Sequence, residues 1–309
     1  MNRRTFLGAA SAAPLMPMPA QVGTQPAMKI TDIKTFLVHT SPVSRNQPGG
    51  RNWCFVKVET DQGIHGIGEA YSVGPDEATV KVIEDFKSWL LGQDPRNIEH
   101  LWALMYNMTR FPGGSVVNAA LSGIEHALWD IAGKAAGLPV YMLAGGKARE
   151  KIRVYQSAGG REPAQAAESA KRLVEKYGYT AIKMSPHMPD TNRVPYNQVT
   201  RMAGRRVQAV REALGPDVDI GVDIHAKFFE VNRAIRMAKE IEPFNPMWLE
   251  EPIRPENTDA MRKLAEHVDI PLASGECNYT KHEFREILAA QCLDIIQPDI
   301  CVCGGFLEM

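Results

Sequence analysis

The sequence is poor in cysteine and lacks any long apolar run. Its five cysteines, at positions 54, 277, 292, 301 and 303, do not form the paired spacings of a zinc site. Their odd number also argues against a complete disulfide framework. No apolar stretch approaches the roughly 20 residues that a membrane-spanning helix needs, so we predict no membrane partner.

Charge of one sign is not in excess either. Lysine and arginine together number 35 and the acids 36, which leaves no basic field of the kind that nucleic-acid binding requires. Neither a Gly-x-Gly-x-x-Gly fingerprint nor a P-loop follows the first strand, which disfavours nucleotide binding. With 309 residues and 44% hydrophobic content, the chain can bury a large core in two domains or one large barrel.

Residues 1–27 differ in character from the rest of the chain. Arg3 and Arg4 precede a short run of small and apolar residues, with Ala20 as a candidate processing point. This pattern is typical of a twin-arginine export signal, which predicts a periplasmic protein that is exported after folding. The alternative is a leader in which the arginines occur by chance, on a cytoplasmic protein.

Residues 28–145 form the first predicted domain, with an α+β architecture. The segments MKITDIKTFLVHT and NWCFVKVETDQGIHGIGEAY alternate apolar and polar residues, which predicts an antiparallel sheet. A helix follows them, and Gly137 stands where that helix should end. The apolar residues at helical spacing are Leu121, Ile124, Leu128 and Ile131.

Residues 146–309 form the second predicted domain, in which strand-like and helix-like segments alternate. The strand-like runs are IRVYQSA, TAIKMS, DIGVDIHA, MWLEEP, IPLASGE and DIIQPDI. Among the helical segments, TRMAGRRVQAVRE is expected to turn its arginines to solvent, and Thr280 and Glu283 have capping-box spacing before another. The alternation predicts a parallel sheet with crossover helices, as a β/α barrel or an open doubly wound sheet, and the missing nucleotide fingerprint favours the barrel.

Acidic residues recur at the carboxyl ends of these strands, where the active site of a β/α barrel lies. Asp223, Glu250 and Glu276 are each about one strand-helix unit from the next. Three carboxylates at one mouth repel one another unless a cation neutralises them, and oxygen ligands without a cysteine or histidine cluster favour Mg²⁺. The alternative is that each acid caps a helix or pairs with a lysine.

Other residues near these strand ends have either a structural or a functional interpretation. Lys183 is either a structural partner for an acid or a group that moves protons. His225 is either a hydrogen-bonded core histidine or a functional group at the mouth, and its position two residues after Asp223 favours the second. Glu251 is interpreted as a residue that orients its surroundings, and Cys277 as a packing residue.

These motifs, taken in order, resemble the enolase superfamily and its mandelate racemase and muconate lactonizing enzyme family, nearest to acid-sugar dehydratases of galactonate dehydratase type. The matching segments, from Met28 onward, are NWCFVKVETDQGIHGIGEAY, IEHALWDIAGKAAGLPVYMLAGG, AIKM, VDIHAKF, WLEEP, LASGE and IIQPD. The resemblance implies an α+β capping domain over a modified TIM-type β/α barrel, a sugar-acid substrate and a homo-oligomer. By motif, Asp223, Glu250 and Glu276 take the Mg²⁺ ligand places.

The resemblance also implies catalytic places. Lys183 stands at the end of the second barrel strand, His225 in a place that resembles the general acid of the dehydratases, and Asp299 where an aspartate partners a basic histidine. Such enzymes remove the proton next to a carboxylate, which the metal makes acidic by stabilising the dianion that results. Elimination of water then needs an acid for the departing hydroxyl, and His225 would serve.

Two departures from the family pattern affect the functional prediction. The family's Lys-x-Lys is KMS from Lys183 onward, which favours dehydration over a racemase-type reaction with a base on that side. The stretch from Lys147 to Met309 is much shorter than the roughly 250 residues of a full barrel, so we expect the last two strands, and the histidine partner of Asp299, to be absent. The alternatives are therefore a racemase or epimerase of the same family and a catalytically inactive truncated chain.

Overall fold

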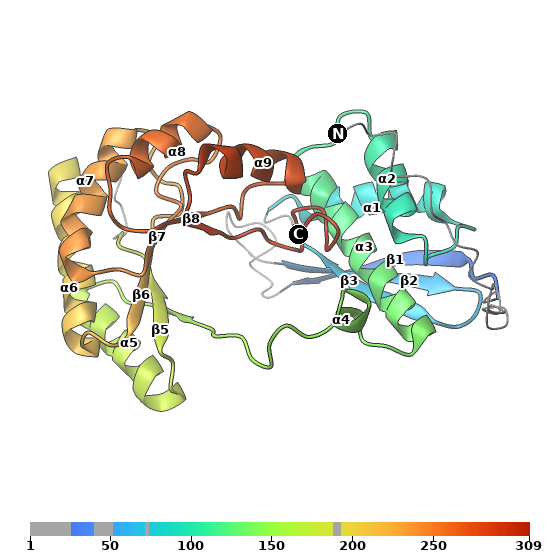
Figure 1. Ribbon diagram of the computed structural model, residues 1–309, viewed down its shortest axis with the longest axis horizontal. Coiled ribbons are helices and arrows are strands. Elements are labelled where there is room, and N and C mark those ends of the chain that lie inside the picture. The colour runs from blue at the N-terminus through green and yellow to red at the C-terminus, as the bar shows by residue number, and fades with distance from the viewer. Residues whose placement is uncertain (1–25, 40–51, 72–73, 188–192) are drawn as a thin grey trace, which may run out of the picture.

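The structure is a computed structural model that describes residues 26–39, 52–71, 74–187 and 193–309. Residues 1–25, which make up most of the predicted export signal, lie outside these ranges. Figure 1 shows an N-terminal region of helices over an antiparallel sheet, and a second region in which helices flank a parallel sheet. Within the described ranges, no helix is long and apolar enough to cross a membrane.

The N-terminal sheet is the antiparallel meander that the alternating sequence predicts. It consists of β1 (Ile30–His39), β2 (Asn52–Thr60) and β3 (His65–Ala70), paired in that order. In β2 every second residue is buried, because alternate side chains of a strand face the core. Gly63 forms the turn between β2 and β3 with a φ of 76°, a conformation that suits glycine.

Helices pack on this sheet and close its core. They are α1 (Asp76–Leu90), α2 (Ile98–Met108), α3 (Gly114–Ala136) and the short α4 (Val140–Leu143). The four apolar residues predicted for the long helix are fully buried in α3, each contributing roughly 1.5–3 kcal/mol. Gly137 ends α3 in the left-handed conformation, so the predicted C-terminal stop is confirmed.

The second region contains six parallel strands, which confirms all six strand-like runs. They are β4 (Gln156–Ala158), β5 (Ala181–Met184), β6 (Asp219–Asp223), β7 (Trp248–Glu250), β8 (Leu272–Ser274) and β9 (Ile295–Ile296). The strands pair in sequence order, with β4 and β9 at the two edges. The described residues thus form most of a β/α barrel without its last two strands, as the sequence predicts.

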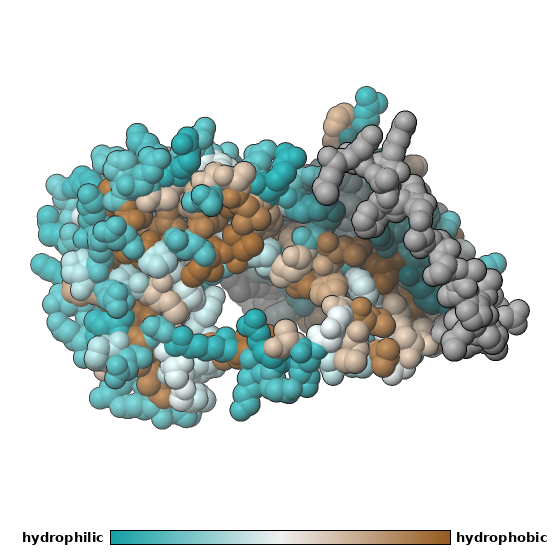
Figure 2. Space-filling model, in the orientation of Figure 1, coloured by the Kyte–Doolittle hydropathy of each residue, from teal (hydrophilic) through white to brown (hydrophobic). Residues whose placement is uncertain are grey.

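Helices connect these strands and cover the sheet. They are α5 (Pro163–Tyr177), α6 (Tyr196–Leu214), α7 (Val231–Ile241), α8 (Thr258–Ala265) and α9 (Thr280–Ala290), with a 3-10 turn, η3 (Glu242–Phe244), after α7. Their apolar faces join the strands in one core cluster. Figure 2 shows hydrophilic residues along the outer edge over α6 and α7 and hydrophobic residues on the inner side, toward the sheet.

Two local predictions for these helices were wrong. Arg206 of α6 does not face solvent: it is buried and donates hydrogen bonds to the carbonyl oxygens of Gly160 (2.9 Å) and Ser185 (3.3 Å). Thr280 is not the N-cap of α9, which begins after Tyr279. Glu283 instead accepts a hydrogen bond from the N–H of Tyr279 (2.9 Å), the residue that caps α9.

Residues 301–307 join the two regions. The Trp102 indole of α2 donates to the Gly304 carbonyl (2.7 Å), and Glu125 of α3 accepts hydrogen bonds from the N–H groups of Phe306 (2.9 Å) and Leu307 (3.0 Å). In Figure 1 the end of the chain accordingly lies beside α3. Because Glu125 is buried, burial raises its pKa despite these hydrogen bonds.

Candidate active site

Four strands bring polar side chains to one edge of the parallel sheet. Lys183 lies one residue before the end of β5, and β6 and β7 end at Asp223 and Glu250, which are paired in register. Glu276 follows β8 by two residues. The sequence-predicted residues therefore share the carboxyl-terminal edge, which forms the mouth of a β/α barrel.

Lys183 is the centre of the charge network at this mouth. Its Nζ lies 2.7 Å from Glu250 Oε1 and 3.0 Å from Asp223 Oδ2, and both carboxylates are about 3% exposed. Burial opposes the charge of the ammonium, but the hydrogen bond to Glu250 and the charge of Asp223 outweigh it and raise the pKa of Lys183. The lysine is therefore a fixed cation at neutral pH.

Asp223 also holds the histidine that follows it. Its Oδ1 accepts a hydrogen bond from the His225 backbone N–H (2.8 Å), and its Oδ2 lies 3.0 Å from His225 Nδ1. The backbone at His225 and Ala226 has positive φ values of 55° and 48°, which non-glycine residues seldom adopt. This bend places the imidazole at the mouth with 54% of its side chain exposed.

Glu250 is held by aromatic and amide neighbours that the sequence did not single out. Its Oε2 accepts hydrogen bonds from Trp248 Nε1 (3.0 Å) and Gln297 Nε2 (3.2 Å). The Tyr155 ring packs edge-on against Trp248 and lies 5.9 Å below Lys183 Nζ. The spacing in the sequence could have predicted the Trp248 contact, because Trp248 precedes Glu250 by two residues and so lies on the same side of the strand.

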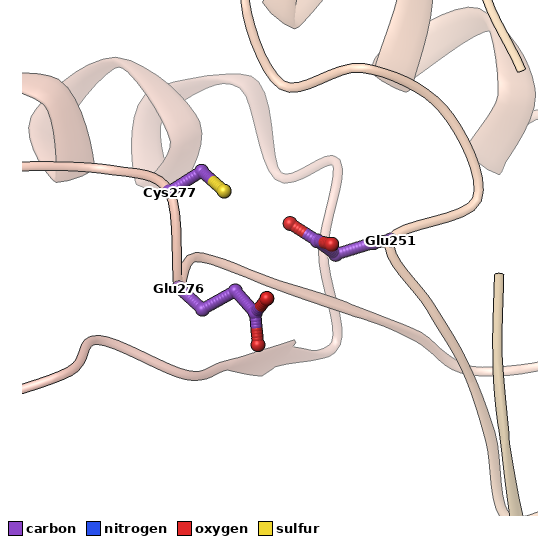
Figure 3. Close-up of side chains that lie close together, drawn as sticks. All are labelled: Glu251, Glu276 and Cys277. Atoms are coloured by element: carbon purple, nitrogen blue, oxygen red, sulfur yellow. The ribbon is translucent and has the colours of Figure 1, made fainter. Parts of the chain in front are cut away.

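Glu276 gathers with Glu251 and Cys277 (Figure 3). One ligand atom from each of these side chains lies within 4.8 Å of the other two. In the part of the chain that the structure describes, Asp223, Glu250 and Glu276 do not gather this closely. The interpretation of Cys277 as a packing residue was wrong, because the residue is exposed and its thiol faces the Glu251 carboxylate.

The three groups in this cluster all have raised pKa values. Glu251 is 3% exposed; its burial, and then the charge of Glu276, raise its pKa to about 7. Glu276 keeps exposed surface, yet partial shielding of its carboxyl from water, followed by the charges of Asp223 and Glu250, raises its pKa. Shielding of the Cys277 sulfur and the charge of Glu251 raise the thiol pKa to about 12. A cation bound near these three groups would favour the two carboxylates and the thiolate over their protonated forms.

Asp299 takes part in a different set of contacts. Its Oδ1 accepts a hydrogen bond from the Cys301 N–H (2.8 Å). It lines a pocket of about 200 Å³ at which the two regions meet, together with Asn52, Trp53, Glu69, Tyr71 and Cys301. Burial, and then the charge of Asp299, raise the pKa of Glu69. Among the described residues, no histidine forms an ion pair with Asp299.

The donor set at the mouth fits a hard divalent cation. Asp223, Glu250 and Glu276 present carboxylate oxygens, which are the preferred ligands of Mg²⁺. The ammonium of Lys183 already lies between two of these carboxylates, which shows that positive charge is favoured there. In addition, Glu251 Oε1 is buried without a hydrogen-bond partner among the described residues.

Comparison with known proteins identifies the family to which this fold belongs. The mandelate racemase/muconate lactonizing enzyme N-terminal domain model matches residues 30–145, and the enolase C-terminal domain-like model matches residues 165–309. A D-galactonate dehydratase from Verminephrobacter eiseniae (strain EF01-2) is 35% identical over 281 residues, which cover 91% of this chain and 70% of the relative. The chain belongs to the mandelate racemase/muconate lactonizing enzyme family of the enolase superfamily.

Solved structures of the superfamily have the same fold. An enolase from Agrobacterium radiobacter, bound to Na and L-malate, is 35% identical with a TM-score of 0.83, over 91% of this chain and 69% of its own. The 3,6-anhydro-D-galactonate cycloisomerase from Zobellia galactanivorans is 33% identical with a TM-score of 0.78, over 91% and 74%. The predicted capping domain and TIM-type barrel are thus confirmed, and the dehydratase relatives confirm the predicted hydro-lyase class.

Proposed function

We propose that this family member is a Mg²⁺-dependent acid-sugar dehydratase of galactonate dehydratase type. The observation that carries the proposal is the charge network at the mouth, where Asp223 and Glu250 from adjacent strands share the ammonium of Lys183 and His225 contacts Asp223. Carboxylates, a fixed cation and an accessible acid are the groups that proton removal beside a carboxylate and loss of a hydroxyl require. The dehydratase relatives support the same reaction.

The proposed binding groups act on the carboxylate of the substrate. Asp223, Glu250 and Glu276 would hold Mg²⁺, which when bound supplies positive charge that stabilises the negative charge developing next to the substrate carboxylate. Lys183 remains protonated, because two buried carboxylates contact it. Its role is therefore to attract and orient the substrate anion, and a role as proton acceptor at neutral pH is disfavoured.

His225 is the proposed general acid. Its Nδ1 faces Asp223 Oδ2 at 3.0 Å, which leaves Nε2 to deliver a proton to the departing hydroxyl. Asp223 fixes the orientation of the ring through both the side-chain and the backbone contact. The half-exposed position of the imidazole lets it regain a proton from water after each turnover.

The proposed proton acceptor is a histidine partnered by Asp299, as the family resemblance implies. Because no described histidine forms an ion pair with Asp299, a catalytically inactive chain is the second candidate. Within the family, a racemase or epimerase is the third, since it would remove the same proton without losing a hydroxyl. These candidates differ in what happens to the substrate, so one assay separates them.

The test is incubation of the full chain and Mg²⁺ with a panel of sugar acids, D-galactonate among them, in deuterated water. Formation of a 2-keto-3-deoxy acid, detected by NMR, supports the dehydratase. The His225→Ala variant should then lose about 10²–10⁴-fold in kcat, whereas His267→Ala, at an exposed position, should not. Deuterium incorporation without loss of water favours the racemase, and no turnover by a folded chain favours the inactive candidate.

We also propose experiments on the domain boundaries, the export signal and the oligomeric state. The capping domain at 28–145 and the barrel at 146–309 are proposed as separate folding units, which limited proteolysis between them would reveal. Residues 1–27 are proposed as a twin-arginine export signal, and cell fractionation with an Arg3→Lys, Arg4→Lys variant tests it. Assembly into a homo-oligomer is open to measurement by light scattering.

A further inference from the structure

The cluster of Glu251, Glu276 and Cys277 combines two hard ligands with a soft one. Their ligand atoms lie within 4.8 Å of one another. Bonds from a zinc-type ion to carboxylate oxygen or thiolate sulfur are about 2.0–2.3 Å, so the three groups need to close by only about 1 Å to share one ion. A sulfur ligand has no place in the Mg²⁺ set, because Mg²⁺ selects oxygen.

A second observation points to a ligand at this place. Glu251 is 3% exposed, and its Oε1 has no hydrogen-bond partner among the described residues. In Figure 3 its carboxyl points toward the gap between Cys277 and Glu276. A buried carboxylate oxygen without a partner is costly, and a bound cation is one arrangement that removes this cost.

The backbone directs Glu251 into the cluster. Its φ of 41° lies in the left-handed region, which a glutamate rarely adopts. Hydrogen bonds on both sides hold the bend, because its N–H donates to the Ala273 carbonyl and its own carbonyl accepts from the Ala226 N–H, both at 2.9 Å. The backbone that presents this side chain is thus fixed before any ligand arrives, which lowers the entropic cost of binding.

Cys277 can be reached from solvent. It is exposed, whereas Cys54, Cys292 and Cys303 are buried and Cys301 is partly buried. Glu276 is exposed as well, so an incoming ion can reach the cluster past these two residues.

We propose that Glu251, Glu276 and Cys277 form a binding site for a thiophilic divalent cation such as Zn²⁺ or Cd²⁺. Binding replaces the S–H bond of Cys277 by a metal–sulfur bond and releases the proton to water, without any change in oxidation state. Two carboxylate oxygens and a water molecule complete a four-coordinate ion. Because Glu276 also belongs to the carboxylates proposed for Mg²⁺, the two ions compete for it, a consequence that rests on the proposed function.

The test is titration of the full, metal-free chain with Cd²⁺, followed by the ultraviolet charge-transfer band of a cadmium–thiolate bond. We expect the band to saturate at one equivalent. Cys277→Ser should abolish it, Glu251→Gln should weaken binding by about tenfold or more, and Cys301→Ser, the matched control, should leave it unchanged. No substrate is present, so the result does not depend on whether the chain is a dehydratase.

A second measurement covers the case in which a variant fails to fold. In the unaltered chain, one equivalent of Cd²⁺ should protect Cys277 from alkylation by a maleimide, as mapped by mass spectrometry, whereas an equal amount of Mg²⁺ should not. The proposal is overturned if Cd²⁺ leaves the alkylation of Cys277 unchanged, or if the charge-transfer band survives in a folded Cys277→Ser variant.

Discussion

Lys183 Nζ lies 2.7 Å from Glu250 Oε1, although β5 and β7, which carry these residues, are separated in the sheet by β6. The lysine reaches across the carboxyl end of β6, where it also contacts Asp223. One ammonium therefore links three consecutive strands at the carboxyl-terminal edge of the sheet. This arrangement makes the stability of the mouth dependent on positive charge.

Replacement of Lys183 by methionine should destabilise the chain and increase its response to Mg²⁺. The change leaves two buried carboxylates without their cation, which costs about 3–5 kcal/mol in the free energy of unfolding. Added Mg²⁺ should restore part of this loss, because a hard cation can neutralise the same oxygens. Urea unfolding with and without Mg²⁺ measures both effects.

Lys171→Met is the control for this substitution. Lys171 pairs with Glu175 on the exposed surface of α5 at 3.6 Å, and such pairs contribute about 0–1 kcal/mol. If Mg²⁺ stabilises the Lys183→Met variant no more than it stabilises the control, the proposed overlap of the ammonium and the metal site is wrong.

His187 should make the chain less stable in mild acid. The residue is buried, with its ring edge-on to Phe228, and burial, followed by the charge of Lys227, lowers its pKa to about 4. A backbone hydrogen bond with Ile224, and then the charge of Asp223, oppose this shift in the pKa, and His225 adds to it. An unfolded histidine takes up its proton near pH 6.5, so the unfolded state binds more protons between pH 6.5 and 4, and stability falls as the pH falls through this window.

The expected loss from this histidine between pH 7 and pH 5 is about 2 kcal/mol. Urea unfolding at the two pH values should therefore show a smaller difference for His187→Gln than for the unaltered chain. His282→Gln, at an exposed position of α9, should keep the full difference. Equal pH dependence in all three proteins would contradict the assignment to His187.

Gly68→Ala should unfold the capping domain or weaken it severely. Gly68 of β3 lies so close to α3 that an added Cβ would be 1.9 Å from the Gly123 carbonyl oxygen. Because the obstacle is backbone, the helix and strand must separate, and we expect a cost of at least about 3 kcal/mol. Thermal unfolding followed by circular dichroism measures it. Gly159→Ala, where an added Cβ meets nothing within 4 Å, should change the midpoint little.

Arg206→Leu should loosen the loops after β4 and β5. The guanidinium donates to the carbonyls of Gly160, Arg161 and Ser185, and its loss removes these hydrogen bonds, each of which contributes about 0.5–1.5 kcal/mol. Hydrogen exchange should rise in residues 159–161, and the free energy of unfolding should fall. Arg205→Leu, one residue earlier on the exposed side of α6, should change neither quantity by a comparable amount.

Much of the fold follows from local patterns in the sequence. Alternation of apolar and polar residues predicted the antiparallel strands, and the alternation of strand-like and helix-like segments predicted the parallel sheet. The helical spacing of apolar residues predicted the buried face of α3, and Gly137 predicted its end. These predictions held because periodicity depends only on backbone geometry, which every strand or helix shares. The failures concerned single side chains, such as Arg206, whose carbonyl partners come from loops far away in the sequence.

The sequence alone also determined which strand ends carry the acids, because the carboxyl ends of adjacent parallel strands lie at one edge whatever the side chains are. Only the tertiary structure decided the partners within that edge: Lys183 spans β6 to reach Glu250, and Glu276 lies with Glu251 and Cys277. Spacing along the chain fixes the face of a residue. Which groups a side chain contacts depends in addition on the backbone bends at His225 and Glu251 and on how deeply each charged group is buried.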